Sequence, residues 1–169
     1  QKHFEIPVLG VIEPGVILAA ERTRNHRIGV IGTEGTILSQ RYQLLLAARD
    51  PRITVVAQAC PLFVPHVEEG LVEHQATELL AQEYLAPLLA SRIDTLILGC
   101  THYPLLEPLL SRLCGPSVVL VNSAQAVALL VAKLLTERGL SADVRSGIDH
   151  FFATDVSDRF LRVGSRFFG

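Results

Sequence analysis

The chain of 169 residues is long enough for one well-packed domain, and a second domain would have to be small or incomplete. Apolar residues make up 49% of the sequence and charged residues 19%, so a sizeable core can form, while the net charge of -2 argues against a nucleic-acid-binding protein. No apolar run approaches the roughly 20 residues of a membrane-spanning helix, and no signal peptide is recognisable at the start. We therefore expect a cytoplasmic protein without nucleic-acid or membrane partners.

Short apolar runs alternate along the chain with segments of helical spacing. The expected strands are VLGVI at 8–12, RIGVIG at 27–32, ITVVA at 53–57, DTLIL at 94–98, VVLV at 118–121 and a terminal HFFATD at 150–155. A helix is expected over 76–90, with Pro87 as a bend or early stop, and another over 126–135, capped by Asn122 or Ser123 and ended by Gly139. This alternation predicts an α/β fold with a parallel sheet flanked by helices.

The segment LGCTHYP at 98–104 is the strongest candidate for chemistry. Cys100 follows the apolar run 94–98, and Pro104 suits the first turn of a following helix. Ligands of open α/β sheets bind where strands give way to helices. The amides at a helix start would favour the Cys100 thiolate and lower its pKa, while His102 adds a proton carrier and Thr101 a hydroxyl. The alternative is a cysteine that merely packs.

Two further segments follow expected strands. Gly32 to Thr36 reads GTEGT and would point backbone amides and the Thr33 and Thr36 hydroxyls at an anion, unless it is only a turn with a hydroxyl cap. It lacks the lysine and the glycine spacing of nucleotide-binding loops. The segment CPLFVPHVEEG at 60–70 is expected as a long loop over the site, in which Glu68 or Glu69 could orient a catalytic histidine.

The remaining cysteines indicate a reduced, intracellular protein. Cys60 and Cys114 have apolar surroundings in the sequence and are expected to pack, so we predict no disulfide and no metal site. The chain begins at Gln1 and contains no methionine, which suggests a piece of a longer protein.

Four segments together resemble the cofactor-independent glutamate racemases. They are IPVLGVIEPG at 6–15, IGVIGTEGT at 28–36, CPLFVPHVEEG at 60–70 and LGCTHYPLL at 98–106, in the order that the family has them. The resemblance runs from about residue 4 to the C-terminus. In the family a first segment, on the order of 100 residues, precedes this region and carries the first catalytic cysteine, for which no matching motif exists here.

The resemblance implies a reaction with two thiols and no cofactor. One thiolate removes the α-proton of glutamate, and a thiol on the opposite face returns a proton. Cys100 matches the second of these cysteines, which acts on L-glutamate, and His102 would assist it. Glu68 matches the acid that works with this histidine, with Glu69 as the alternative, and Thr33, Thr36 and Thr101 match positions that hold the substrate carboxylates.

The resemblance also divides the chain. Residues 1–118 would form one complete racemase-like subdomain with the second catalytic cysteine, and residues 119–169 would complete a partly missing first subdomain. Its implied product, D-glutamate, feeds peptidoglycan synthesis, and family members commonly form a homodimer. The 169-residue chain alone is expected to be inactive as a racemase. The alternatives are a racemase for aspartate or hydantoins, and a non-catalytic α/β module that binds a dicarboxylate through GTEGT.

Overall fold

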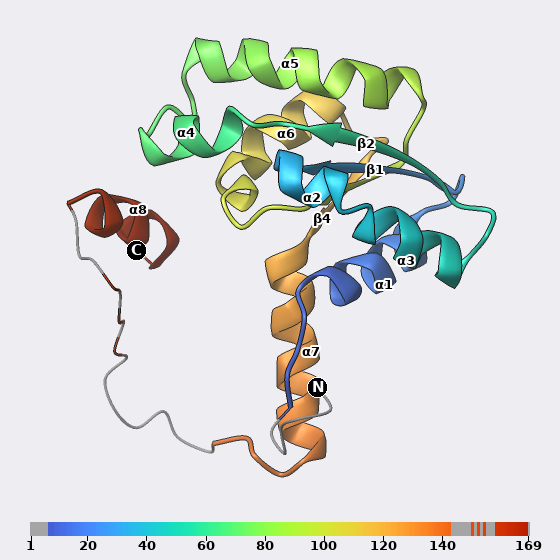
Figure 1. Cartoon of the computed structure of the whole chain (residues 1–169), viewed down its shortest axis with the longest axis vertical. Coiled ribbons are helices and arrows are strands. Elements are labelled where there is room, and N and C mark those ends of the chain that lie inside the picture. The colour runs from blue at the N-terminus through green and yellow to red at the C-terminus, as the bar shows by residue number, and fades with distance from the viewer. Residues whose placement is uncertain (1–6, 143–149, 151, 153, 155–157, 169) are drawn as a thin grey trace.

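The computed structural model describes residues 7–142, 150, 152, 154 and 158–168. Its centre is a sheet of four parallel strands in the order β2-β1-β3-β4 (Figure 1). The strands are β1 (Arg27–Gly32), β2 (Thr54–Ala59), β3 (Thr95–Leu98) and β4 (Val119–Asn122). The predicted α/β fold with a parallel sheet flanked by helices is therefore confirmed. Since β4 pairs with β3, residues 119–122 extend this sheet, and the domain boundary at 118 remains a prediction.

Helices connect the strands and cover both faces of the sheet (Figure 1). They are α1 (Ile12–Arg22), α2 (Glu34–Leu38), α3 (Arg41–Arg49), α4 (Phe63–Glu68), α5 (Gln75–Ala90), the 3-10 helix η1 (Tyr103–Leu106), α6 (Glu107–Cys114), α7 (Ser123–Glu137) and α8 (Asp158–Phe168).

Side chains of the strands alternate between two cores. Along β3, Leu96 and Leu98 point into one core with side chains of α4, α5, η1 and α6, whereas Ile97 points into the other, beside α1 and α3. In β1, Val30 and Ile31 divide in the same way. All five side chains are at most 1% exposed. A sheet that is buried on both faces needs apolar residues at successive positions, whereas a sheet with one exposed face alternates apolar and polar residues. The strands β1 and β3 have such continuous apolar runs.

The apolar run at 8–12 is not a strand, so that prediction is wrong. Residues 7–11 form no regular element, and Ile12 opens α1. Pro14 occupies the first turn, where its missing N–H costs no hydrogen bond, and Glu13 there complements the positive end of the helix dipole. Val16 and Ala19 then bury one side of α1 against the sheet. A short apolar run does not by itself separate a strand from the start of a buried helix.

Two other expectations concern helix ends. The early stop at Pro87 is wrong, because α5 continues to Ala90, with the buried Leu88 holding its last turn against the core. The cap of α7 is confirmed: the Asn122 Oδ1 accepts hydrogen bonds from the N–H groups of Ala124, at 3.0 Å, and Gln125. The expected terminal strand at 150–155 falls mainly outside the described residues.

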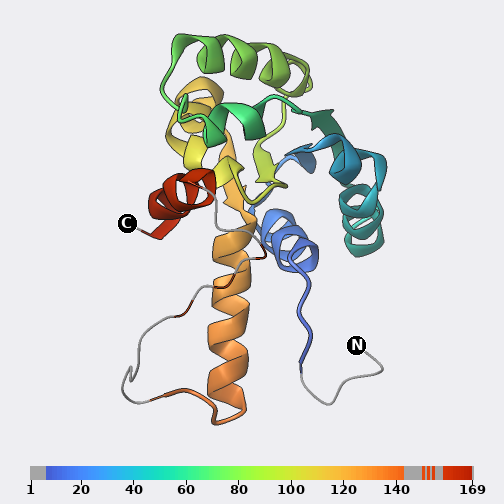
Figure 2. The ribbon, with the colours of Figure 1, turned by 60° about the vertical axis from the view of Figure 1, so that its left-hand side comes forward.

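The last two helices differ in how they contact the rest of the molecule. α7 runs away from the sheet, with its first turns against α1, and forms the long vertical helix of Figure 2. α8 lies beside the body of the molecule and contacts α4. Within the described residues, no helix is both long enough and apolar enough to cross a membrane.

Candidate active site

Each predicted site residue follows the carboxyl end of a strand. Thr33 and Thr36 come after β1, Glu68 lies on α4 after β2, and Cys100 and His102 follow β3. Because the strands are parallel, these ends meet at one edge of the sheet, which is where the loops of α/β proteins bind ligands. The sequence order therefore brings three separate segments to one edge.

Cys100 lies two residues after the end of β3 and is half-buried. Its thiol borders a mainly apolar cavity of about 360 Å³, whose other walls include Tyr42, Pro104, Ser123 and Val127. Burial raises the pKa of the Cys100 thiol and outweighs the N–H groups of His102 and Tyr103 and the Thr101 hydroxyl, which lower it. The expected lowering of this pKa is therefore wrong for this structure. The predicted amide donors are present, but the apolar surroundings penalise the thiolate more strongly.

His102 and Glu68 form a pair beside this cysteine. The Nε2 of His102 lies 3.3 Å from the Oε1 of Glu68, and both side chains are about three-quarters buried, being 23% and 27% exposed. A carboxylate only accepts hydrogen bonds, so Nε2 carries the proton, and Nδ1 of a neutral ring is left as the acceptor. Nδ1 lies 3.5 Å from the Thr101 hydroxyl. The pair can therefore hold the imidazole in the tautomer whose Nδ1, beside the Thr101 hydroxyl, is free to accept a proton.

The structure decides which of the two neighbouring acids meets the histidine. Glu68 is the last residue of α4 and faces His102, whereas Glu69 is exposed. The expected long loop at 60–70 is wrong in this respect, because α4 occupies its middle. Within a helix, Phe63 and Val67 fall on one buried face four residues apart.

Aromatic packing fixes α4 against η1. The ring of Phe63 meets those of Tyr84 and Tyr103 edge to face, with centroids 5.2 Å and 5.3 Å away. The Tyr103 hydroxyl donates a hydrogen bond of 2.8 Å to the Cys60 carbonyl. Because Tyr103 is the neighbour of His102, these contacts set the distance between the imidazole and Glu68. Only the aromatic residues around the two motifs signal this role in the sequence, and we did not predict it.

The GTEGT segment forms the start of α2, as predicted. The Thr33 hydroxyl caps the helix by accepting a hydrogen bond of 3.3 Å from the Thr36 N–H, and the two hydroxyl oxygens lie 3.0 Å apart. Thr36 also approaches the β3 side, since a Cβ added at Gly99 would lie 3.6 Å from its methyl carbon. Of the three predicted threonines, Thr101 lines the cavity at Cys100.

Gly99 and Tyr42 belong to the site although the sequence did not single them out. A Cβ at Gly99 would lie 2.7 Å from the Ile31 carbonyl oxygen and 3.2 Å from the Tyr42 ring. Glycine therefore lets the chain that carries Cys100 pass close to β1. The Tyr42 hydroxyl lies 3.4 Å from the Ser123 Oγ, which donates to the Leu98 carbonyl at 3.2 Å. The glycine before the cysteine was visible in the sequence, whereas the Tyr42 contact joins distant segments.

The other two cysteines are buried, as predicted. Cys60 is 0% exposed and Cys114 is 7% exposed, and burial raises their pKa values to about 12 and about 11. The structure describes all three cysteines, and all are free thiols. Among the described residues, no three His, Cys, Asp or Glu side chains gather closely enough to hold a metal ion.

The parallel α/β sheet carries a half-buried thiol and an imidazole–carboxylate pair at its carboxyl edge, and these are groups that can accept and donate protons. Residues 1–131 match the Asp/Glu/Hydantoin racemase family, and the chain belongs to this family. The resemblance inferred from the sequence is thereby confirmed.

Within the family, the chain is similar to glutamate racemases. It is 47% identical over 172 residues to the glutamate racemase of Geobacter metallireducens, a match that covers 100% of this chain and 63% of that protein. A glutamate racemase isoform from Bacillus anthracis has a crystal structure with a TM-score of 0.92 at 38% identity, covering 99% of this chain and 63% of that one. The glutamate racemase of Francisella tularensis in complex with D-glutamate has a TM-score of 0.87 at 36% identity, covering 96% and 60%. The chain thus spans about three-fifths of the length of these relatives.

Proposed function

We propose that the full-length gene product carrying this chain interconverts L- and D-glutamate. The observation that carries the proposal is the Cys100 thiol beside the His102–Glu68 pair, with Nε2 and Oε1 3.3 Å apart. In this reaction a thiolate takes the α-proton, and a thiol on the opposite face gives one to the resulting carbanion. A thiol suits both tasks, because its ordinary pKa of about 8.5 lies near neutrality.

The chain contributes one of the two thiols in this proposal. Cys60 and Cys114 are buried, and their pKa values are raised to about 12 and about 11, so neither suits proton transfer at the cavity. Cys100 is then the thiol left for the reaction, and its match to the second cysteine of the family assigns it in this proposal to the proton of L-glutamate and to reprotonation of the same face. His102 receives and returns the thiol proton, and Glu68 holds the imidazole. In the 169-residue chain alone, Cys100 could exchange an α-proton without inverting the centre.

Glutamate as substrate rests on the similarity to glutamate racemases and on the threonines near the site. One of these relatives, the Francisella tularensis enzyme, was solved in complex with D-glutamate. In our proposal Thr33, Thr36 and Thr101 donate hydrogen bonds to the substrate carboxylates. D-glutamate would then serve peptidoglycan synthesis in the cytoplasm. The homodimer remains a prediction from the family.

The test measures racemisation of both enantiomers by circular dichroism, with α-proton exchange in deuterated water followed by NMR. The full-length gene product should racemise glutamate, and the variant Cys100→Ser should lose this activity. Aspartate and a substituted hydantoin serve as competing substrates. If the folded, unaltered protein binds glutamate without exchanging its α-proton, the dicarboxylate-binding module is supported instead. If it racemises aspartate or the hydantoin faster than glutamate, the protein is a racemase for that substrate.

A further inference from the structure

Helix α8 lies against the end of α4 that carries Glu68 (Figures 1 and 2). Its sequence is amphipathic, with Phe160, Val163 and Phe167 at helical spacing, and Val163 is partly buried. Two residues of its last turn, Arg166 and Phe167, contact α4 and the histidine that follows β3. These contacts join segments separated by about a third or more of the chain, and no motif in the sequence indicates them.

Arg166 contacts the carboxyl end of α4. Its Nη1 donates a hydrogen bond of 2.8 Å to the carbonyl oxygen of Val67, the residue before Glu68. The same oxygen accepts a 3.0 Å hydrogen bond from the N–H of Gly70. Carbonyls at a helix end lack partners within the helix and carry partial negative charge, so a guanidinium stabilises them. Arg166 therefore adds an anchor from a distant helix to the turn that carries Glu68.

The chain leaves room for this guanidinium at Gly70. Gly70 has a φ of +81°, which favours glycine, and it ends α4 in a left-handed turn. A Cβ added here would overlap the Arg166 guanidinium. Glycine at this position therefore allows both the left-handed turn and the close approach of the Arg166 guanidinium.

Phe167 contacts the other member of the catalytic pair. Its ring meets the imidazole of His102 edge to face, with centroids 6.2 Å apart and an interplanar angle of 82°. Aromatic pairs with centroids up to about 7 Å apart attract each other in this geometry. Consecutive residues of α8 thus hold the two partners of one ion pair, Arg166 through the backbone beneath Glu68 and Phe167 through the imidazole ring.

We propose that Arg166 and Phe167 are positioning residues for the His102–Glu68 pair, so that docking of α8 sets the rate of proton transfer at Cys100. The inference rests on the proposed racemase function. A displacement of about 1 Å in a catalytic group can slow a reaction about 100-fold. α8 would therefore act on one of the two proton transfers, the one at Cys100, and leave the opposite face unaffected.

The test compares Arg166→Ala and Phe167→Ala in the full-length gene product, with Arg162→Ala as the matched control. Arg162 is exposed one turn earlier on α8, and no hydrogen bond or ion pair of its guanidinium is found among the described residues. We expect kcat to fall about tenfold in each test variant and by less than twofold in the control. Phe167→Leu should recover part of the rate through its apolar contact, and Arg166→Lys should recover less because lysine lacks the planar fork.

Kinetic isotope effects separate positioning from a general loss of structure. With α-deuterated substrates, a slower transfer at Cys100 raises the isotope effect for L-glutamate, whose proton Cys100 removes, and lowers it for D-glutamate. A variant that is merely less folded loses rate with unchanged isotope effects. The proposal is supported if, in both Arg166→Ala and Phe167→Ala, the isotope effect rises for L-glutamate and falls for D-glutamate. Isotope effects equal to those of Arg162→Ala overturn it.

A second measurement keeps failure of this inference distinct from failure of the proposed function. In the NMR spectrum of the imidazole of His102, the ring of Phe167 contributes a ring-current shift that Phe167→Ala should remove and Arg162→Ala should retain. If the unaltered protein has this shift but does not racemise glutamate, the proposed function is wrong and the docking of α8 stands. If racemisation depends on Cys100 but the shift is absent, the docking of α8 is wrong.

Discussion

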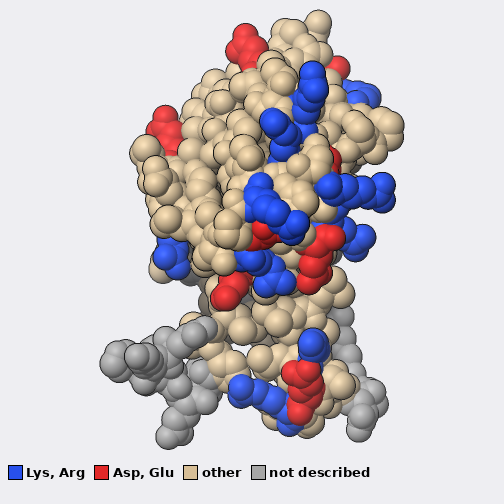
Figure 3. All heavy atoms as spheres, turned by 90° about the vertical axis from the view of Figure 1, so that its right-hand side faces the viewer, with Lys and Arg blue, Asp and Glu red and all other residues tan. Residues whose placement is uncertain are grey.

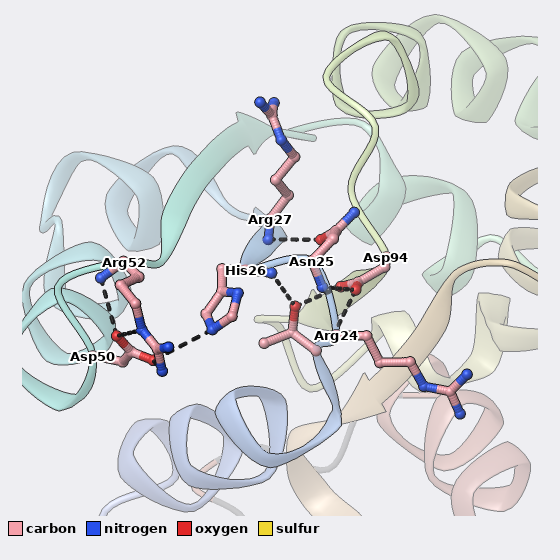
Figure 4. A network of polar contacts seen from close by, with 8 residues as sticks. Arg24, Asn25, His26, Arg27, Asp50, Arg52 and Asp94 are labelled. Atoms are coloured by element: carbon pink, nitrogen blue, oxygen red, sulfur yellow. Dashed lines mark hydrogen bonds and ion pairs between the residues drawn. The ribbon is translucent and has the colours of Figure 1, made fainter.

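The two edges of the sheet carry similar residue types and use them differently. At the amino edge, Asp94 accepts hydrogen bonds from the Thr23 hydroxyl at 2.6 Å and from the N–H groups of Arg24 and Asn25 at 2.7 Å each (Figure 4). The Thr95 hydroxyl donates a fourth, at 3.0 Å. Burial, the largest single effect, works against its ionisation, but these bonds together lower the pKa of Asp94. Its carboxylate is thus an internal brace between the β1 and β3 starts.

The same edge shows acidic side chains among the basic ones (Figure 3). The guanidinium of Arg52 donates two hydrogen bonds to Asp50, 2.8 Å and 3.0 Å long, and Arg49 lies 3.9 Å from Glu21. At the carboxyl edge, by contrast, the thiol of Cys100 borders a cavity, and the His102–Glu68 pair lies beside it. Polar and charged side chains that line a cavity can contact a ligand and therefore form a candidate site. Side chains of the same kinds that hydrogen-bond to one another instead stabilise the fold.

The largest expected effect is a loss of activity on changing Cys100, at the carboxyl edge. Cys100→Ser should lower racemisation about 1000-fold, because a hydroxyl is a far weaker acid than a thiol and cannot exchange the α-proton near neutral pH. The free energy of unfolding should change little. Circular dichroism of glutamate and thermal unfolding measure the two quantities. Cys114→Ala is the matched control: it removes a buried thiol, so it should lower stability and leave kcat per folded molecule unchanged.

The next effect tests which acid serves the site. Glu68→Gln should lower kcat roughly 100-fold, because the neutral amide no longer holds a protonated imidazole. Glu69→Gln, next to it and exposed, should change kcat by less than about twofold. Steady-state kinetics in both directions compare the two. An equal loss in both variants would contradict the geometry, in which Glu68 alone of these two faces His102.

The amino edge should respond in stability. Asp94→Asn removes a charge that four donors share, so the free energy of unfolding should fall by about 2 kcal/mol near neutral pH, with kcat per folded molecule unchanged. Because the pKa of Asp94 is lower in the folded state, this stabilisation is present above the unfolded pKa of about 3.9. It is lost as the pH falls through the folded value. The difference from the unaltered chain in urea unfolding should therefore shrink from about pH 7 to about pH 3.

Asp50→Asn serves as the control for that measurement. The Asp50 carboxylate lies at the surface, where hydrogen bonds from Arg52 lower its pKa to about 2. Solvent screens such a pair, so this variant should shift the unfolding midpoint less than Asp94→Asn does. A larger shift would mean that the surface pair, and not Asp94, braces the amino edge.

Features encoded by neighbouring residues could be predicted from the sequence. The apolar run before Cys100 and the Pro104 after it placed the thiol at the end of β3, and the hydroxyl of Thr33 at the start of α2 followed from local capping rules. The order of strands and helices then brought these segments to one edge. For the same reason the run at 8–12 was mistaken for a strand, because its apolar residues lead into helix α1, which begins at Ile12 and has Pro14 in its first turn.

Features that depend on distant segments could not be predicted. The amides near Cys100 are visible in the local pattern, but the burial that raises its pKa comes from packing against a core built by distant segments. The contact between Arg166 and Val67 spans 99 positions in the sequence. The residues alone left Glu68 and Glu69 open, and the resemblance favoured Glu68, but only the packing of α4 shows that Glu68 faces His102. The local sequence therefore predicted which residues lie at the site, whereas their pKa values and contacts depend on tertiary packing.

Thr33 should give the smallest effect. In our proposal it belongs to both the fold and the site, so it limits the contrast between the two edges. Thr33→Ala removes the cap of α2, so the free energy of unfolding should fall by about 1 kcal/mol. In our proposal the same hydroxyl binds a substrate carboxylate, so KM for glutamate should rise about fivefold. Thr33→Ser keeps the hydroxyl and should recover both quantities. A loss of stability with unchanged KM would assign Thr33 to the fold alone and leave Thr36 and Thr101 to hold the carboxylates.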